Sequence, residues 1–251
     1  ERSRYIDKRF SLCFLVYQDK MKAIIVFCMF LMAIPIFAGT YRDDFENQQD
    51  FINDRQNGVW IEELNNPAVE TIEWENGAIK IDMTASGGGL SIGDSTWKDY
   101  TVECKVKQLK INFLGSGILL HHPVIGGGTA YFFSIKGNEA GIYRYFSSPG
   151  LDNSPFEPEL GRWYSLKAVI QGNQLEFYID GELMAKAEDD YIKEGYVGVG
   201  TFGTALFDDF VMTGPDVKDG GHWNPKAHEQ LSSLEPKNSL AGTWGRLKCD
   251  N

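Results

Sequence analysis

The sequence has little of what a metalloprotein or a nucleic-acid-binding protein needs. It holds four Cys and four His in 251 residues, and no thiolate cluster that would favour zinc. Basic residues are also scarce, because 24 Lys and Arg stand against 35 Asp and Glu, for a net charge of -11. A surface of this charge repels nucleic acid and anionic lipid, and it suits divalent cations. We therefore expect no nucleic acid among the partners.

The sequence also lacks an apolar run long enough for a membrane span. Lys22 precedes the 15-residue apolar run Ala23–Phe37, which is shorter than the roughly 20 residues that a bilayer span needs and which contains Pro35. A charged residue, an apolar run and small residues such as Ala38, in that order, are typical of a secretory signal peptide. We expect residues 21–38 to be this signal peptide, cleaved near Ala38. The mature chain is then secreted or periplasmic, with no integral membrane segment.

Two cysteines remain after such cleavage, Cys104 and Cys249. Cys104 lies at an apolar position of the alternating stretch YTVECKVKQL, so we interpret it as a small buried hydrophobic residue. A disulfide bond to Cys249 is the alternative in an oxidising compartment.

Helical periodicity is absent over any useful length, and short runs of β-branched and aromatic residues dominate instead. Between residues 41 and 214 these runs are separated by Gly, Asn, Asp and Pro, which predicts an all-β sandwich or jelly roll of two antiparallel sheets. We expect strands near 59–63, 69–75, 78–83, 90–93, 100–108, 117–122, 130–136, 140–146, 162–170, 174–179, 183–187, 196–202 and 205–213. AYFFSIK and GIYRYF are apolar or aromatic at both parities, so their strands are covered on both sides or line a groove.

Three further divisions complete the organisation of the chain. Residues 1–20 have no clear period, and we expect an upstream or non-native segment there. Residues 41–214 form the jelly-roll domain. Residues 215–251 are polar and rich in Gly and Pro, which predicts a flexible tail.

The stretch NQLEFYIDGELMAKA, residues 173–187, places Glu176, Asp180 and Glu182 within seven residues. Jelly-roll β-glucanases that retain anomeric configuration carry E-x-D-x-E or E-x-D-x-x-E on one strand, so that a period of two directs all three acids into one cleft. Here the spacing is four and then two. Asp180-Gly181 between two alternating runs indicates a hairpin turn instead.

The register of this hairpin follows from the pairing that brings apolar residues together. A two-residue loop would pair Leu175 with Lys186. A three-residue loop, 179–181, pairs Leu175 with Ala185 and puts Gly181 in the left-handed conformation. We therefore predict the three-residue loop, with Glu176 and Glu182 on the face opposite the core.

Several segments together resemble concanavalin A-like jelly-roll domains, in particular the laminin-G-like and 3-keto-disaccharide-hydrolase-like group of exported bacterial proteins. They are YRDDFEN, WENGAIKI, WKDYTVECKVK, SGILLHH, ELGRWYSLKAVIQGNQLEFYIDGELMAKA and GYVGVGTFGTALFDDFVMTG, in the order that is typical of the family. The resemblance covers residues 41–214. In many relatives an Arg follows the apolar run of the strand that corresponds to SGILLHH, whereas this chain has His121 and His122. Adjacent residues of a strand point to opposite faces, so at most one of these histidines faces the groove. The alternative is a strand-end His that is bound by water or by the backbone.

The resemblance implies an exported, lectin-like module that binds a glycan or polysaccharide without catalysis. Sugars stack on aromatic rings, and a few polar groups fix their hydroxyls. The candidate ligand-binding residues are Trp97, His121, Tyr131, Phe133, Tyr143, Arg144 and Tyr145, of which we expect about half to be core residues instead. Two alternatives stay open: a glycoside-cleaving enzyme that acts through His121 and Glu139, and a structural or adhesive module.

Acidic residues gather at the two ends of the predicted domain, in RDDFE and in FDDF. The first and last strands of a jelly roll lie side by side, so Asp44 and Glu46 are expected near Asp208 and Asp209. Calcium takes six to eight oxygen ligands, and related modules hold a structural calcium at such a junction. These four residues are therefore candidate calcium ligands. The alternative is that Asp44 and Asp209 accept hydrogen bonds from backbone N–H groups at strand ends.

Overall fold

The structure is a computed structural model that describes residues 38–64, 69–83, 87–123, 129–144 and 147–225. The chain divides into two units, Glu1–Phe37 and Ala38–Asn251, and the account below concerns the second. The predicted signal peptide up to Phe37, Tyr145 and Cys249 lie outside the described residues. In the part of the chain that is described, no helix is long and apolar enough to span a membrane.

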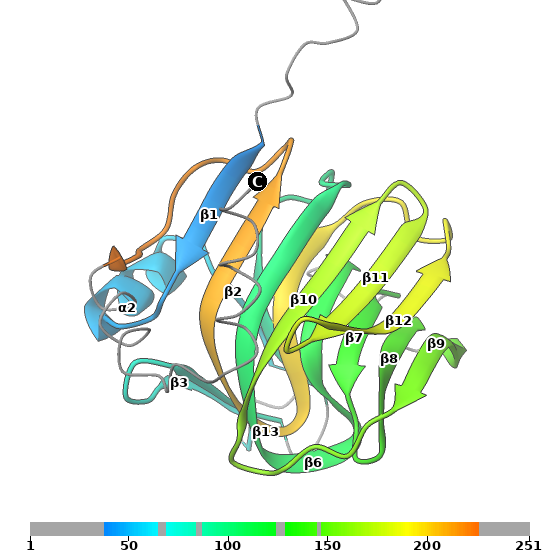
Figure 1. The fold of residues 1–251 in the computed structure, drawn as a ribbon. Coiled ribbons are helices and arrows are strands. Elements are labelled where there is room, and N and C mark those ends of the chain that lie inside the picture. Colours follow the sequence, from blue (N-terminus) through cyan, green and yellow to red (C-terminus); the bar gives the residue numbers. More distant parts are fainter. Residues whose placement is uncertain (1–37, 65–68, 84–86, 124–128, 145–146, 226–251) are drawn as a thin grey trace, which may run out of the picture. The chain divides into compact units, whose positions relative to one another are not determined.

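Thirteen strands and one helix follow one another in the described residues (Figure 1). In chain order they are β1 (Gly39–Asp43), α2 (Gln48–Gln56), β2 (Ile61–Glu63), β3 (Thr71–Trp74), β4 (Ile79–Asp82), β5 (Gly88–Ile92), β6 (Tyr100–His122), β7 (Tyr131–Ile135), β8 (Glu139–Arg144), β9 (Ser147–Pro155), β10 (Trp163–Gln171), β11 (Gln174–Ile179), β12 (Glu182–Glu188) and β13 (Tyr196–Gly214).

Two antiparallel layers face each other, and the long strands β6 and β13 run through both. The first sheet has the order β12-β11-β10-β6-β13-β4-β3, with β1 paired to the end of β13. The second continues from the other half of β6 and β13, with β7, β8 and β9 on one side and β5 and β2 on the other. β6 bends between them at Gly115, whose φ of +72° and close approach to the Ile135 carbonyl leave no room for a Cβ. The predicted jelly-roll architecture is confirmed.

The main core fills the space between the two sheets. The rings of Phe133 on β7 and Phe177 on β11 meet edge to face across it, 5.9 Å apart. Cys104 lies in this core as a free thiol, 3 % exposed, and burial raises its pKa. It has the small, buried, apolar role that its position in an alternating strand predicts.

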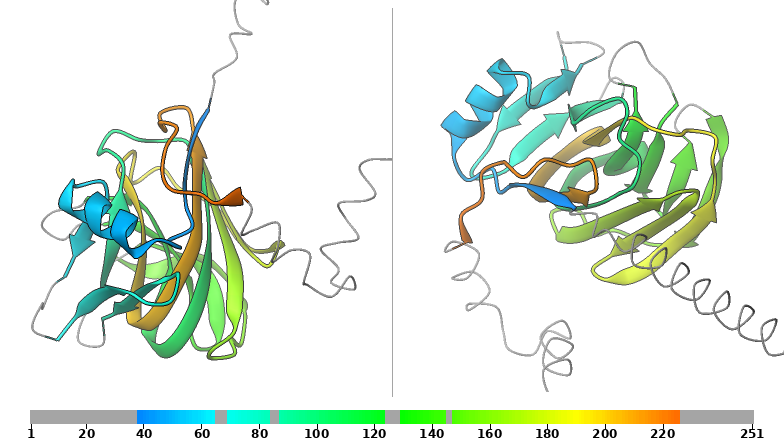
Figure 2. Two further views of the ribbon diagram at one scale, coloured as in Figure 1. Left: turned by 90° about the vertical axis from the view of Figure 1, so that its left-hand side faces the viewer. Right: turned by 90° about the horizontal axis from the view of Figure 1, so that it is seen from above.

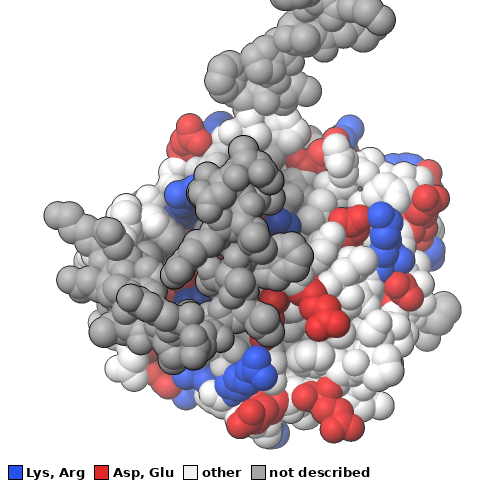
Figure 3. Space-filling view, in the orientation of Figure 1, with Lys and Arg blue, Asp and Glu red and all other residues white. Residues whose placement is uncertain are grey.

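The outer faces of the two sheets differ. That of the first sheet is solvated and carries interspersed charges (Figure 3), with Lys167 3.0 Å from Glu103 and Lys186 2.7 Å from Glu176. That of the second sheet is covered, because Phe132 belongs to a smaller hydrophobic cluster with Leu119, Ala130 and Phe202. All five residues of β7 are buried, so of the two predicted outcomes for AYFFSIK, coverage on both sides is the one found.

Helix α2 is the one described element of another type in this mostly β domain, and the sequence pattern did not predict it. Asn47 caps it, since its side chain accepts from the Gln49 N–H, and Phe51 is its one buried residue. A nine-residue helix that buries one side chain has almost no apolar period, so the pattern gave no signal. The strands β1 and β9 were also missed, because neither has an alternating apolar run.

The hairpin between β11 and β12 has a two-residue turn, which corrects the predicted three-residue loop. Ile179 pairs with Glu182, and Asp180 and Gly181 have φ of 50° and 83°, as a type I′ turn requires. An irregularity after Tyr178 then shifts the register, so that Leu175 pairs with Ala187 rather than Lys186. A bulge of this kind adds one residue to one strand and restores the apolar face. Glu176, Asp180 and Glu182 form no catalytic group in this hairpin, because Asp180 lies in the turn and Glu176 accepts hydrogen bonds from Lys186 and Tyr178.

Residues 215–225 correct the prediction of a flexible tail for that part of the chain. They lie along β1 (Figure 2), where Arg42 N–H donates to Gly220 O at 3.0 Å and Asp44 N–H donates to His222 O at 2.9 Å. Val217 is buried. We call residues 215–225 the strap, which runs along β1 and forms one isolated parallel bridge with it, between Tyr41 and Gly220.

Candidate functional site

Four side chains meet at one end of the sandwich, and we call them the rim cluster: Tyr131, Arg144, Asp189 and Tyr191. Tyr131 begins β7, Arg144 ends β8, and Asp189 directly follows β12. The paired register of Tyr131 and Arg144 sets these two side by side. The loop 189–195, which leads into β13, supplies the other two.

Asp189 holds the cluster together from a buried position. The Asp189 side chain is only 6 % exposed. Its carboxylate accepts hydrogen bonds from Arg144 Nε at 3.0 Å, from Arg144 Nη2 and from the Tyr131 hydroxyl. It also accepts the backbone N–H of Tyr191 at 3.0 Å. Burial alone would raise the pKa of Asp189, but these donors lower the pKa below its usual value. The ionised carboxylate therefore fixes both the guanidinium and the loop.

Tyr191 is the exposed member of the cluster. It is 67 % exposed, and the guanidinium carbon of Arg144 lies 5.0 Å from its ring centroid. The Arg144 side chain is itself 32 % exposed. An open aromatic face beside a fixed hydrogen-bond donor can stack on the C–H face of a sugar ring while the donor contacts a hydroxyl.

His121 lies behind the cluster and supports its loop. One ring nitrogen lies 3.0 Å from the Ile192 carbonyl oxygen and the other 2.9 Å from that of Lys98. Trp97 adds to this support, since its carbonyl accepts the Gly195 N–H at 3.0 Å. Both ring nitrogens of His121 face backbone carbonyls and the residue is 2 % exposed, so it positions the loop and has no free nitrogen for acid–base chemistry.

The neighbouring histidine, His122, has a separate partner. His122 Nδ1 lies 2.9 Å from Glu63 Oε1, which also accepts the Ser91 hydroxyl. The division of the two histidines follows from the backbone, because His121 has a φ of 53° and the pairing with β13 is irregular at this point.

The other predicted ligand-binding residues lie apart from the rim cluster. Phe133 has no exposed surface and belongs to the main core. Tyr143 is 8 % exposed, with the Lys136 ammonium 3.4 Å from its ring centroid and its hydroxyl donating to Glu139 at 3.0 Å. Lys136 also binds Glu139 at 3.0 Å, and this ion pair, with the Tyr143 hydroxyl, lowers the pKa of Glu139.

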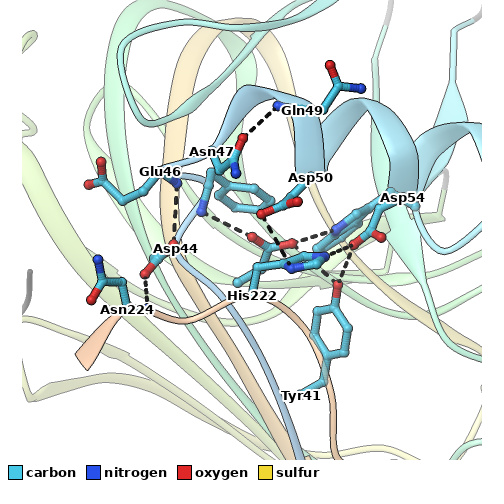
Figure 4. Close-up of polar contacts among 12 residues, drawn as sticks. Tyr41, Asp44, Glu46, Asn47, Gln49, Asp50, Asp54, His222 and Asn224 are labelled. Atoms are coloured by element: carbon cyan, nitrogen blue, oxygen red, sulfur yellow. Dashed lines mark hydrogen bonds and ion pairs between the residues drawn. The ribbon is translucent and has the colours of Figure 1, made fainter. Parts of the chain in front are cut away.

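The acidic residues at the domain junction have separate partners. Asp44 accepts Asn224 N–H at 2.5 Å and Glu46 N–H at 3.3 Å (Figure 4), while Asp209 lies 2.6 Å from Lys105. Burial, with the nearby charges of Asp209 and Glu46, raises the pKa of Asp208 to about 7. Among the residues that the structure describes, no group of three or more His, Cys, Asp and Glu side chains is arranged to hold a metal ion. Calcium at this junction remains a prediction.

Beside this junction the strap docks on α2 through His222. Its Nε2 lies 3.3 Å from Asp54 and its Nδ1 3.6 Å from Asp50 (Figure 4). Beneath them, Asp43 accepts the indole N–H of Trp60 at 3.2 Å, and burial raises the pKa of Asp43 to about 6.

Comparison with known proteins agrees with this architecture. The family model of the galactocerebrosidase C-terminal lectin domain matches residues 68–214. The chain belongs to this family. No curated protein matches it significantly.

Solved structures show the same fold at low sequence identity. The carbohydrate binding module CBM66 from Bacillus subtilis has a TM-score of 0.53 and 16 % identity, over 62 % of this chain and 96 % of the module. A cellulose induced protein, Cip1, has a TM-score of 0.50 and 15 % identity, over 71 % of this chain and 99 % of its own. A Bacillus subtilis protein of unknown function with a galectin-like fold has a TM-score of 0.50 and 13 % identity, over 68 % and 94 % of the two chains.

Sequence reasoning selected Tyr131, Arg144 and His121, which the structure brings together, and missed Asp189 and Tyr191. The missed pair lies in EDDYIKEG, a polar segment between two strands. An aromatic residue among acids in a loop is the signal that could have found them, since exposed loop aromatics are more often functional than core aromatics are.

Proposed function

We propose that this lectin-domain family member binds a glycan at the rim cluster. The observation that carries the proposal is the exposed ring of Tyr191 beside Arg144, with both held by the buried carboxylate of Asp189. Binding is stronger when the contact groups are fixed before the ligand arrives, because less conformational freedom is lost. The positive charge of Arg144 is compensated by Asp189, so we expect a neutral sugar rather than an anionic one.

The finer parts of the proposal concern export and family. A chain that is secreted, as the apolar run before Ala38 predicts, would meet glycans outside the cell. We assign it to the laminin-G-like and 3-keto-disaccharide-hydrolase-like group within the jelly-roll fold. We propose binding without cleavage, since the two residues of the enzymatic alternative have structural partners: His121 faces backbone carbonyls, and Glu139 binds Lys136 and Tyr143.

The test is a glycan array followed by titration of any bound neutral glycan. Replacement Tyr191→Ala is expected to weaken binding by about 1 kcal/mol, or roughly fivefold, because the stacking surface is lost. Tyr178→Ala is the matched control, since Tyr178 lies on the outer face of the first sheet and contacts Glu176. Equal effects of the two replacements, or the absence of any bound glycan, would contradict the proposal. Cleaved product after incubation would support an enzyme instead.

A further inference from the structure

A hollow lies on the far side of the molecule from the rim cluster. Figures 1 and 2 place α2 and β12 at opposite sides of the sandwich, and the hollow lies between α2 and β2. Its volume is about 490 Å³. Small-molecule sites have volumes of roughly 300–1,000 Å³ and combine an apolar lining with a few fixed polar groups. The residues that line this hollow are Ile52, Arg55, Gln56, Gly58, Trp60, Ile61 and Glu62.

The polar groups of the hollow are held in place. Arg55 forms an ion pair with Glu62, donates through Nη1 to the Ile72 carbonyl at 3.4 Å, and lies 5.2 Å from the ring centroid of Phe51. Glu62 is positioned by the pairing of β2 with β5. The two side chains are each about 30 % exposed, at 30 % and 28 %. A fixed donor and a fixed acceptor therefore stand side by side at the wall of the hollow.

The remaining wall supplies one free amide and an apolar surface. Gln56 is exposed on α2, so its side chain offers both a donor and an acceptor. Ile52 and Ile61 are half-buried, and Trp60 is anchored below them by the bond of its indole N–H to Asp43. The lining as a whole therefore carries no net charge. It offers both hydrogen-bond donors and acceptors, which suits neighbouring hydroxyl groups, because each hydroxyl both donates and accepts a hydrogen bond.

We propose that this hollow is a second carbohydrate site, which takes one neutral pyranose ring with vicinal hydroxyls. An anionic or cationic ligand would have to compete with the Arg55–Glu62 ion pair, whereas a pair of hydroxyls adds to it. The ring's C–H face packs on Ile52 and Ile61. Together with the proposed rim-cluster site, it would give the domain one sugar site at each side of the sandwich. The proposal does not depend on binding at the rim cluster.

The test uses methyl β-galactopyranoside and methyl β-glucopyranoside as probes with the full chain. We expect at least one of them to shift the backbone amide NMR signals of Gly58 and Ile61 at millimolar concentrations. Gln56→Ala is expected to weaken this binding about two- to tenfold, because one neutral hydrogen-bonding group is lost. Asn53→Ala, an exposed amide on the same helix that does not line the hollow, is the matched control and should leave the affinity unchanged.

A second variant keeps the result decisive. Ile52→Trp fills the hollow and should abolish the signal shifts while the melting temperature stays near that of the wild type. Tyr191→Ala should leave these shifts intact, which separates this site from the rim cluster. The proposal is overturned if neither probe shifts the two amides, or if the shifts persist unchanged in both Gln56→Ala and Ile52→Trp.

Discussion

Arg144 and Asp189 are 45 residues apart in the chain and form an ion pair in which Nε lies 3.0 Å from the carboxylate. Arg144 ends a strand of the second sheet, whereas Asp189 follows the last strand of the hairpin on the first sheet. The pair therefore ties the two layers together at the end of the sandwich where β13 begins. It also fixes the guanidinium below the open ring of Tyr191.

Replacement Asp189→Asn should loosen the rim cluster. The carboxylate accepts from Arg144, Tyr131 and the Tyr191 N–H, and a hydrogen bond to a charged group contributes roughly 1.5–3 kcal/mol. We expect a lower melting temperature and a loss of glycan affinity of about tenfold or more. Asp190→Asn is the matched control, because Asp190 is next in the chain, is 77 % exposed and forms an ion pair with the exposed Lys193. A similar loss in both variants would argue against the role of Asp189.

Replacement Gly181→Ala should destabilise the hairpin by about 1 kcal/mol. Gly181 has a φ of +83°, which L residues adopt at a cost, although no atom lies near a Cβ at this position. Gly137→Ala is the control, since its Cβ also meets open space and its φ is not in the left-handed region. Urea unfolding measures the difference between the two variants. An equal stability would show that the type I′ turn is not under conformational constraint.

Replacement His222→Gln should weaken the strap in a pH-dependent way. Burial alone would lower the pKa of His222, but the hydrogen bond and charge of Asp54, with Asp50 and Asp43, raise it. Because the folded-state pKa is raised, its stabilising contribution is complete below the unfolded-state pKa of about 6.5 and is lost as the pH rises through the higher folded value. The pKa of Asp43, raised to about 6, changes stability in the same direction.

Hydrogen exchange of the Arg42 and Asp44 amides reports on the strap directly, since both donate to it. At pH 5.5 we expect His222→Gln to accelerate this exchange by up to about fivefold, because a partly exposed ion pair contributes less than about 1 kcal/mol. At pH 8.5 the difference should vanish. Lys218→Gln removes a charge of the same segment that acts on Asp94 and should have no such pH dependence. A His222 effect that is equal at both pH values would contradict the ion-pair account.

Calcium should raise the melting temperature if the junction of Asp44, Glu46, Asp208 and Asp209 binds it in the folded state only, and chelation should lower it. The double replacement of Asp44 and Asp209 by Ala should abolish this dependence. In the structure these two residues already accept a backbone N–H and contact Lys105, respectively. The absence of any calcium-dependent shift in the unmodified protein would leave them with those structural roles alone.

The sequence by itself determined the class of fold and the identity of the core face. Apolar and polar residues alternate strictly over residues 100–107, and Asp180-Gly181 favours a turn. Both signals depend on the conformation of a few consecutive residues, so they can be recognised without the tertiary structure. Periodicity of two places apolar side chains on one face wherever the strand later pairs. The burial of Cys104 and the rejection of Glu176, Asp180 and Glu182 as a catalytic group followed from that argument.

Only the tertiary structure decided which residues of different strands meet. The sequence makes Tyr131, Phe133 and Arg144 candidates alike, because aromatic rings stack on sugars and polar groups fix sugar hydroxyls. In the structure, the strand register buries Phe133 in the core. Tyr131 and Arg144 instead contact the carboxylate of Asp189, which begins the loop after β12. The hairpin bulge, the nine-residue helix and the strap depend likewise on partners far away in the chain. Long-range pairing determines their free energy, and no local pattern encodes the partner.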